Sequence, residues 1–344
     1  MKWSREKMIR ERMLRQGLMQ PLEHEEDEAA YIALFKQLQP VSPVHFTRPG
    51  DPPRLVHRTK YDDMEMASRL RERHRLVKGR FQGGRIAYVL EEELKLYATA
   101  FRKEPAVYKQ IHEDIMYAIR QSGGLSKEQL KEELGYPAKE IGKALQELHT
   151  AFLLYEQQTD GDWDTGWLEF ANEWFPLPAG EDNRQEAIDQ VIVRFIQSMV
   201  FATEVQIKSW SGLTGKAIKS ALSRLTSSEL LACIELPGAG KGWMLVQDLD
   251  EDSSGHIKRS GGSSEALPQG VYMMDRSDYL VRAYLDELQI KYKGLEVLQY
   301  LLIDGDFQGV VTGHWRIGPY NVEDVLLDLE PAEAKSRQTK LSRP

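Results

Sequence analysis

An internal repeat constrains the fold of this chain more than any other feature. One copy, LSKEQLKEELGYPAKEIGKALQELHTAFLL, begins at Leu125. The other, ATEVQIKSWSGLTGKAIKSALSRLTSSELL, begins at Ala202, 77 residues later. Residues of the same kind stand at matching positions in both copies. The chain must therefore build the same small supersecondary unit at least twice.

The pattern of each copy predicts a helix, a tight turn and a second helix. Ser126 and Thr203 are placed to act as N-caps, because their hydroxyls accept a hydrogen bond from an unpaired backbone amide. Gly135 and Gly212 follow one short helix later, where a left-handed residue is needed to end it. Apolar residues spaced four and three apart then indicate the buried face of the second helix.

A helix is also predicted before each copy, in IHEDIMYAI and AIDQVIVRFIQSM, and two short strands after it. Three helices and a two-stranded ribbon make a winged helix, so we expect winged-helix domains at residues 105–178 and 179–247. The second helix of the turn approaches DNA with its N-terminal end. Lys139 and Lys216 lie there and are candidate DNA-binding residues. The alternative is that the tandem domains serve only as a protein–protein scaffold.

The N-terminal part fits a related domain, residues 1–104. A helix is predicted over residues 3–20 and another over DEAAYIALFKQL, and GGRIAYVLEEE predicts a strand from Ile86 to Leu90 that leads into a helix. This part is therefore expected to be a third winged-helix-like domain, and it contains the Gln37-Leu38-Gln39 motif.

The C-terminal part has a different pattern. Residues 248–269 are rich in Ser, Gly and charge and are expected to be a flexible linker or loop. Residues 270–331 include alternating apolar and polar positions with Gly breaks, which predicts a small β-barrel or sheet. Residues 332–344 are expected to be a disordered tail. The fold class is thus α+β: tandem winged helices followed by a small C-terminal β domain.

Charge is unevenly distributed in this acidic chain, whose formal net charge is −8. The stretch from Arg54 to Arg85, called here the basic stripe, holds ten Lys or Arg against four Asp or Glu. Such a stripe is either a footprint for phosphates or a solvated helix face. Arg80 and Arg85, beside its Gly-rich turn, are candidate phosphate contacts.

Several classes of protein are disfavoured. A single cysteine, Cys233, rules out a disulfide framework within the chain. No signal peptide, bilayer-spanning run, metal-ligand spacing or Ser/His/Asp arrangement is evident. We expect a cytoplasmic monomer with no cofactor, metal or membrane association.

The Gln37-Leu38-Gln39 motif stands where a helix meets a proline. Gln39 precedes Pro40, and the residue before a proline is pushed out of helical conformation. If the chain is extended from Leu38 onward, both amides can converge on one pocket. The structural alternative is that the glutamines simply cap and close the helix end.

The order LRQGL, QLQPVSP, GGRIAYVLEEE, two winged helices and a late GHWR strand resembles the AlkZ/YcaQ family of bacterial DNA glycosylases. The resemblance covers about residues 8–330 and is diffuse apart from the catalytic motif, which is Gln, an apolar residue, then Gln or Asp. It implies that Gln37 and Gln39 are catalytic, that double-stranded DNA is the partner, and that alkylated or cross-linked purines are the substrates. Separately, His314-Trp315-Arg316 in the late strand could brace the duplex, which makes Arg316 a candidate DNA-binding residue; the favoured alternative is an ordinary packed strand.

The chemistry of an amide is consistent with such a role. Glutamine cannot act as a general base, but it can hold and orient a water molecule. This suffices when the leaving base is already cationic, as an N7-alkylated guanine is. Because no lysine is required, a monofunctional glycosylase is expected.

One departure from the family pattern keeps a second hypothesis open. The family usually carries a threonine and a histidine in the strand where this chain has Arg85 and Ala87. The alternative is a winged-helix DNA-binding or regulatory protein without base excision, and a weaker one is a scaffold without DNA affinity.

Overall fold

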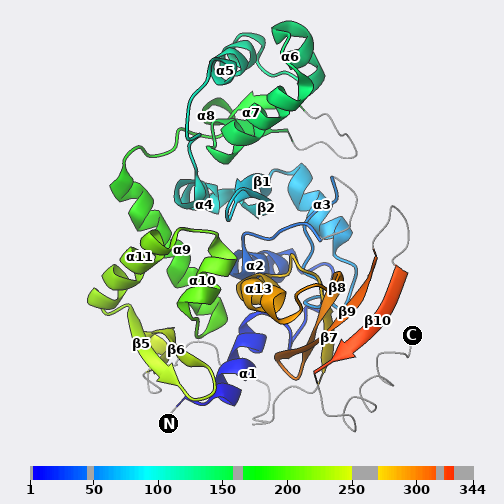
Figure 1. Cartoon of the computed structure of the whole chain (residues 1–344), viewed down its shortest axis with the longest axis vertical. Coiled ribbons are helices and arrows are strands. Elements are labelled where there is room, and N and C mark those ends of the chain that lie inside the picture. Colours follow the sequence, from blue (N-terminus) through cyan, green and yellow to red (C-terminus); the bar gives the residue numbers. More distant parts are fainter. Residues whose placement is uncertain (1–2, 45–49, 158–165, 250–269, 315–320, 329–344) are drawn as a thin grey trace.

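A computed structural model describes residues 3–44, 50–157, 166–249, 270–314 and 321–328 (Figure 1). The described chain is a mixture of helices and antiparallel sheets, in agreement with the predicted α+β class. The predicted linker, apart from its first two residues, and the predicted tail lie outside these ranges.

The N-terminal part, residues 3–104, contains four helices and a two-stranded sheet. Helix α1 is shorter than predicted, because it begins after the N-cap Ser4 and gives way to Gly17, whose φ is +73°. The elements in order are α1 (Arg5–Arg15), α2 (Glu28–Leu38), α3 (Met64–Glu72), β1 (Leu76–Phe81), β2 (Arg85–Leu90), the 3-10 helix η1 (Glu91–Glu93) and α4 (Leu94–Phe101).

Two units with the same order of elements follow. The middle unit contains α5 (Gln110–Ser122), α6 (Lys127–Leu134), α7 (Ala138–Thr150), β3 (Leu154–Glu156), β4 (Trp167–Glu169) and α8 (Phe170–Glu173). The third unit contains α9 (Glu181–Met199), α10 (Glu204–Ser211), α11 (Gly215–Ser227), β5 (Leu231–Leu236), β6 (Gly240–Leu245) and α12 (Val246–Leu249). In both units three helices precede an antiparallel pair of strands, as the repeat predicted.

The predicted caps of the repeat are confirmed. Ser126 and Thr203 each form a capping box, in which the hydroxyl accepts from the third amide of the helix and a glutamine side chain accepts from the N-cap amide. Gly135 and Gly212 end those helices at φ values of +68° and +65°. In each unit, the residue just before the N-cap also pairs with a tryptophan of the second strand.

The C-terminal part is an open antiparallel sheet with one helix. Its elements are β7 (Val271–Met274), α13 (Tyr279–Lys291), β8 (Val297–Ile303), β9 (Asp306–His314) and β10 (Asn321–Leu327). The strand order is β10-β9-β8-β7, and the two outer strands are not paired with each other in the described residues. Of the two predicted possibilities, barrel or sheet, the described strands form a sheet.

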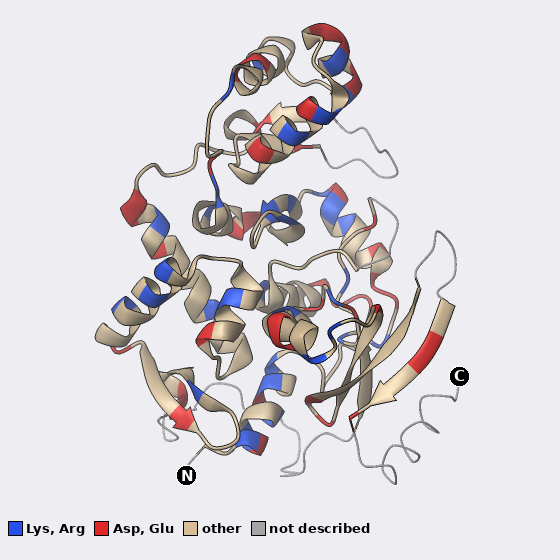
Figure 2. Cartoon of the chain, viewed as in Figure 1, with Lys and Arg blue, Asp and Glu red and all other residues tan. Residues whose placement is uncertain are grey.

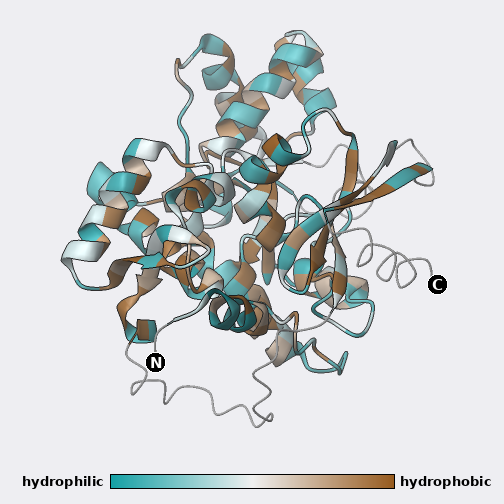
Figure 3. Ribbon diagram, turned by 60° about the horizontal axis from the view of Figure 1, so that its bottom comes forward, coloured by the Kyte–Doolittle hydropathy of each residue, from teal (hydrophilic) through white to brown (hydrophobic). Residues whose placement is uncertain are grey.

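One large hydrophobic core joins the N-terminal part, the third unit and the C-terminal part, whereas the middle unit also has a smaller core of its own. Figure 3 shows hydrophobic residues along the strands of the C-terminal sheet and on parts of the inner helices. The middle unit lies at one end of the molecule, whereas α2 and α13 lie near the centre of the molecule (Figure 1). The segment that carries the two glutamines is therefore held from several sides.

The turn of the β1–β2 hairpin lies where three parts of the molecule meet. Backbone atoms of Gln82 and Gly83 lie so close to Gly212 of the third unit that a Cβ there would come within 2.9 Å of them. Gly84 lies beside Thr150 of the middle unit. This hairpin is consequently an internal joint.

Candidate functional site

Helix α2 carries the Gln37-Leu38-Gln39 motif at its C-terminal end. Asp27 caps the start of the helix by accepting a hydrogen bond from the Ala30 amide at 2.9 Å. Tyr31, Phe35 and Leu38, spaced four and three apart, are all buried and fix the rotation of the helix. The motif is thus placed by ordinary amphipathic packing.

Gln39 ends the helix and is almost fully buried, with 2% of its surface exposed. Its Oε1 accepts a hydrogen bond from the Leu90 amide of β2 at 2.9 Å. Its Nε2 is buried and meets no partner with full hydrogen-bond geometry among the described residues, although the Tyr97 hydroxyl lies close to this amide. Two backbone hydrogen bonds between Val41 and Tyr88 hold the following segment against the same strand. Gln39 therefore connects α2 to β2 through its Oε1, while its Nε2 makes no full hydrogen bond among the described residues.

Gln37 lies in the last turn of α2 and is partly exposed. Its backbone carbonyl accepts a hydrogen bond from the Ser198 hydroxyl at 2.7 Å, while no hydrogen bond of its side chain is found within the described ranges. Convergence of the two amides required a chain extended from Leu38. This condition is not met, because Leu38 is still helical and the extended conformation begins at Gln39, the residue before Pro40. The structure puts both glutamines at the same helix end without a hydrogen bond between them.

A polar cluster lies behind Gln39. Arg194 of α9 pairs with Glu93, and its guanidinium lies 6.0 Å from the centre of the Tyr97 ring. Lys36 of α2 pairs with Glu93 at 2.9 Å. Burial raises the pKa of the Tyr97 hydroxyl to about 12, while the charge of Arg194 and a contact with the Gln39 amide act in the opposite direction. Tyr97 thus remains a neutral hydroxyl beside Gln39 at neutral pH.

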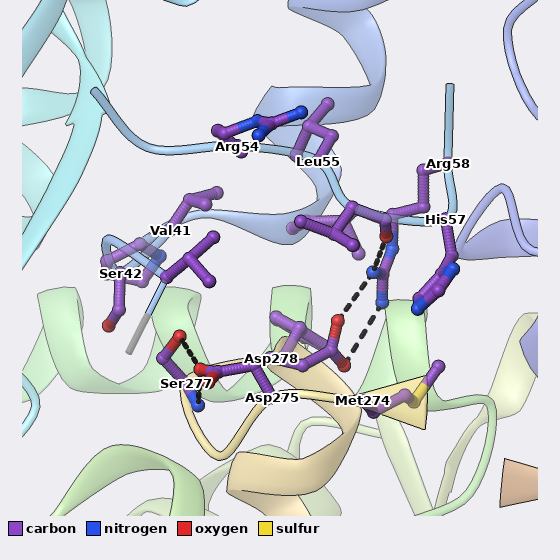
Figure 4. A pocket seen from close by; sticks show the side chains of 15 residues that line it. Val41, Ser42, Arg54, Leu55, His57, Arg58, Met274, Asp275, Ser277 and Asp278 are labelled. Carbon is purple, nitrogen blue, oxygen red and sulfur yellow. Dashed lines mark hydrogen bonds and ion pairs between the residues drawn. The ribbon is translucent and has the colours of Figure 1, made fainter. Parts of the chain in front are cut away.

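A small pocket lies next to the motif (Figure 4). Its lining comes from residues 38–44, 54–58 and 274–279, and one wall holds the ion pair between Arg58 and Asp278. Its open space is about 40 Å³, close to what one water molecule occupies. Leu38 and Pro40 line it, but Gln37 and Gln39 do not.

A second pocket, of about 440 Å³, is more open and lies between α1, α13 and the β8–β9 turn. Arg5 and Asp306 form an ion pair at its edge, with 2.5 Å between Nη2 and Oδ1. Neither glutamine lines this pocket. The expected convergence of both amides on one pocket is thus not seen in either of these two pockets.

Most of the basic stripe has a structural role. Arg58 is 2% exposed and pairs with Asp278 at 2.6 Å, and Arg71 is 5% exposed and donates to the Gly50 carbonyl. The other stripe cations that contact a carboxylate or a backbone carbonyl are Arg54, Lys60, Arg69, Arg73, Arg75, Lys78 and Arg80. The stripe as a whole is therefore not a free phosphate surface. Figure 2 likewise shows Lys and Arg interspersed with Asp and Glu on α3, α7 and α10.

The two arginines predicted to contact phosphate differ from each other. Arg80 is partly buried and donates to the Gly84 carbonyl at 3.0 Å, within its own hairpin. Arg85 is exposed, and no ion pair of its guanidinium is found in the part of the chain that the structure describes. Desolvation, and then the charge of Arg276, lower the pKa of Arg85, whereas the charge of Asp286 raises it, so Arg85 has both a cation and a carboxylate nearby. Arg85 is the better placed of the two for an anion.

Lys139 and Lys216 occupy equivalent places. Each is the second residue of its helix, α7 or α11, and each is exposed. Neither has an ion pair among the described residues. Arg316 lies outside the described residues.

Sequence reasoning missed Tyr97, Arg194 and Ser198, the three residues that surround the glutamines. Ser198 is separated from Gln37 by 161 residues, and Arg194 from Glu93 by 101. No motif spacing reports contacts over such distances. The alternation of buried and exposed positions in α9 indicates only that one face is covered.

Some classes of site are not seen in the described ranges. They contain no group of three or more His, Cys, Asp or Glu side chains that could hold a metal ion. None of the described helices is both long and apolar enough to cross a membrane.

Comparison with known proteins gives the family. The profile described as "DNA glycosylase AlkZ-like" matches residues 85–259, which is 175 of the 344 residues. The chain belongs to the AlkZ-like DNA glycosylase family. Among solved structures, the Streptomyces sahachiroi DNA glycosylase AlkZ is similar with a TM-score of 0.67 and 15% identity, over 98% of this chain and 95% of that one. At this identity the likeness shows a shared fold. A comparison with curated proteins found no match.

The match to the AlkZ-like family begins at Arg85 and so does not include Gln37 or Gln39. It does include Glu93, Tyr97 and Arg194 of the polar cluster, though not Lys36, and the whole of α9. Ala87, where the sequence resemblance led us to expect histidine, is fully buried in β2. The match over residues 85–259 therefore shows the family independently of the glutamine motif.

Proposed function

We propose that this AlkZ-like chain is a DNA repair glycosylase that hydrolyses the N-glycosidic bond of alkylated purines, with Gln37 and Gln39 orienting the attacking water. The observation that carries this proposal is the buried amide of Gln39 at the same helix end as Gln37, with an Nε2 that makes no full hydrogen bond within the described residues. Family membership supports the reaction class. Substrates with N7-alkyl or cross-linked purine adducts are part of the same proposal.

The reaction suits neutral amides. An N7-alkylpurine carries a positive charge, so its bond to the sugar breaks with oxocarbenium character and needs no strong acid. The protein must hold one water molecule and stabilise developing positive charge. A carbonyl oxygen has two lone pairs, and Leu90 uses only one of those on Gln39 Oε1. In this proposal the other lone pair accepts from the water, and no lysine nucleophile is needed, which predicts a monofunctional enzyme.

We further propose that the three helix-and-strand units are winged helices, at residues 1–104, 105–178 and 179–247, which bind double-stranded DNA. The order of helices and strands in the middle and third units supports this assignment. Lys139 and Lys216, at the start of α7 and α11, would then contact phosphates. Arg85 and Arg316 are proposed to contribute further contacts, whereas Arg80 would act by shaping the hairpin.

Release of N7-methylguanine from duplex DNA tests the enzymatic proposal. Abasic sites are converted to strand breaks with alkali and counted under single-turnover conditions. We expect product with the wild type and about a 100-fold slower rate in Gln37→Ala and Gln39→Ala, because each variant loses a group that positions the water. Gln190→Ala, on the exposed face of α9, is the matched control and should react at the wild-type rate.

A second function, a winged-helix DNA-binding or regulatory protein without excision, is favoured by one observation. Ala87 offers no polar atom at the position where the family usually has histidine, and it is fully buried. This function predicts no base release from wild type and equal DNA affinity in the wild type and both glutamine variants. Such a result would replace the glycosylase proposal.

A further inference from the structure

Helix α9 of the third unit carries one polar side chain that contacts the end of α2 and another that contacts Glu93 and Tyr97. Arg194 and Ser198 are four residues apart and so lie on the same face of α9. Ser198 is 1% exposed, and its hydroxyl donates to the Gln37 carbonyl at 2.7 Å. This hydrogen bond uses a carbonyl at the helix end, where the following amides can no longer reach it. Ser198 therefore fixes the last turn of α2, from which the Gln37 side chain projects.

Arg194 acts on the other glutamine through a chain of contacts. It pairs with Glu93, which is 8% exposed, and Glu93 also receives Lys36 of α2. The same guanidinium lies against the ring of Tyr97. Tyr97 is 1% exposed, and its hydroxyl neighbours the Gln39 amide. The cluster thus connects Lys36, which precedes Gln37 in the sequence, to Tyr97, which lies next to the Gln39 amide in space.

The orientation of the Gln39 amide follows from these contacts. Leu90 offers an N–H, so the oxygen of the amide must face it and the NH₂ group must face the other way. A buried donor without a full hydrogen bond is unfavourable. Such an amide persists only where its surroundings leave it no better orientation. Simple packing does not require a polar cluster here, since apolar side chains would fill the same space.

We propose that Ser198, Arg194 and Tyr97 are positioning residues that hold Gln37 and Gln39 in the geometry needed to orient water. The proposal rests on the glycosylase function proposed above. It makes the site a joint product of the N-terminal part and the third unit, with α9 as the element that aligns both glutamines.

The test compares Ser198→Ala, Ser198→Thr and Tyr97→Phe with Ser220→Ala as the control. Ser220 is an exposed serine of α11 that accepts a hydrogen bond from Arg224 at 2.7 Å, so its loss removes a similar contact away from the site. Three quantities are measured: the single-turnover rate on N7-methylguanine DNA, the affinity for the same duplex, and hydrogen exchange of the Leu90 amide. Circular dichroism confirms that each variant is folded.

We expect Ser198→Ala and Tyr97→Phe to slow base release about tenfold or more with DNA affinity unchanged, because misplacing a reacting group affects rate rather than binding. Ser198→Thr should restore the rate, Ser220→Ala should not change it, and Leu90 should exchange faster in the two slow variants. If Ser198→Ala and Tyr97→Phe react at the wild-type rate while Gln37→Ala is inactive, the positioning role is overturned and the glycosylase proposal stands. If the wild type releases no base, the glycosylase proposal fails, and the exchange of Leu90 then decides: faster exchange supports positioning, and unchanged exchange overturns it.

Discussion

Single buried cations join distant parts of this chain. Arg12 donates to the carbonyls of Met199 and Phe201 at 2.9 and 3.0 Å, and to the Tyr284 hydroxyl at 2.7 Å. Arg58 likewise reaches Asp278 across 220 residues. A guanidinium satisfies several acceptors at once, because its five N–H groups have fixed directions. These arginines therefore hold the N-terminal part to the third unit and to α13.

Asp278→Asn tests the buried ion pair while keeping an oxygen that can cap α13. Loss of the carboxylate leaves the Arg58 charge buried and unpaired, so we expect the free energy of unfolding to fall by about 3 kcal/mol. Asp306→Asn removes the more exposed pair with Arg5 and should cost only about 0–1 kcal/mol. Urea denaturation of both variants measures the difference. Equal losses would mean that burial adds nothing to the Arg58 pair.

At the scale of elements, two glycines with the same backbone conformation have different neighbours. Gly135 and Gly212 both end a helix at a positive φ, but a Cβ on Gly135 would meet nothing within 4 Å. A Cβ on Gly212 would lie 2.9 Å from backbone atoms of Gln82 and Gly83. Gly135→Ala should therefore cost about 1 kcal/mol from the left-handed conformation alone. Gly212→Ala should cost more, and thermal unfolding of both variants tests whether the hairpin contact matters.

The recognition role of α7 and α11 gives another prediction. Lys139→Glu and Lys216→Glu should each weaken binding to duplex DNA of any sequence and reduce the salt slope of the affinity by about one. Lys293→Glu, an exposed site after α13 and outside the proposed winged helices, shows what a charge change of the same size does elsewhere. Fluorescence anisotropy over a range of salt concentrations provides the slopes. An effect no larger than that of Lys293→Glu would exclude α7 and α11 as the phosphate-contacting helices.

The elements that could be predicted from the sequence are those fixed by neighbouring residues. The caps Ser126 and Thr203 and the end of α2 before Pro40 follow rules that span only a few positions. The basic stripe could not be interpreted in the same way, because Arg58 finds its partner at Asp278, far along the chain. The same limit applied to the candidate site. Its glutamines stand out as a motif, but Ser198 beside them becomes visible only when the chain is folded.

At the scale of the whole molecule, the middle unit has a hydrophobic core of its own and also packs against the N-terminal part. Its own core holds α5, α6 and α7 together, and its contact with the N-terminal part runs through β1. Lys78 pairs with Glu156 at 2.7 Å across this contact. Phe152 lies 5.3 Å from Phe81, between ring centres. The position of the middle unit relative to the glutamines therefore depends on a mixed apolar and polar joint.

His149 makes this joint sensitive to acid. Burial lowers the pKa of His149 well below its ordinary value near 6.5, and the charges of Arg80 and Lys78 lower it further. The folded protein thus holds His149 neutral, while the unfolded chain takes up a proton as the pH falls below about 6.5. Stability contributed by the neutral imidazole is complete above that pH and is lost as the pH falls toward the lower, folded pKa.

We expect urea denaturation to show a smaller loss of stability between pH 7 and pH 5 in His149→Gln than in wild type. His24→Gln, an exposed histidine, should behave as wild type, and an unchanged pH dependence in His149→Gln would show that the joint takes up no proton at this side chain.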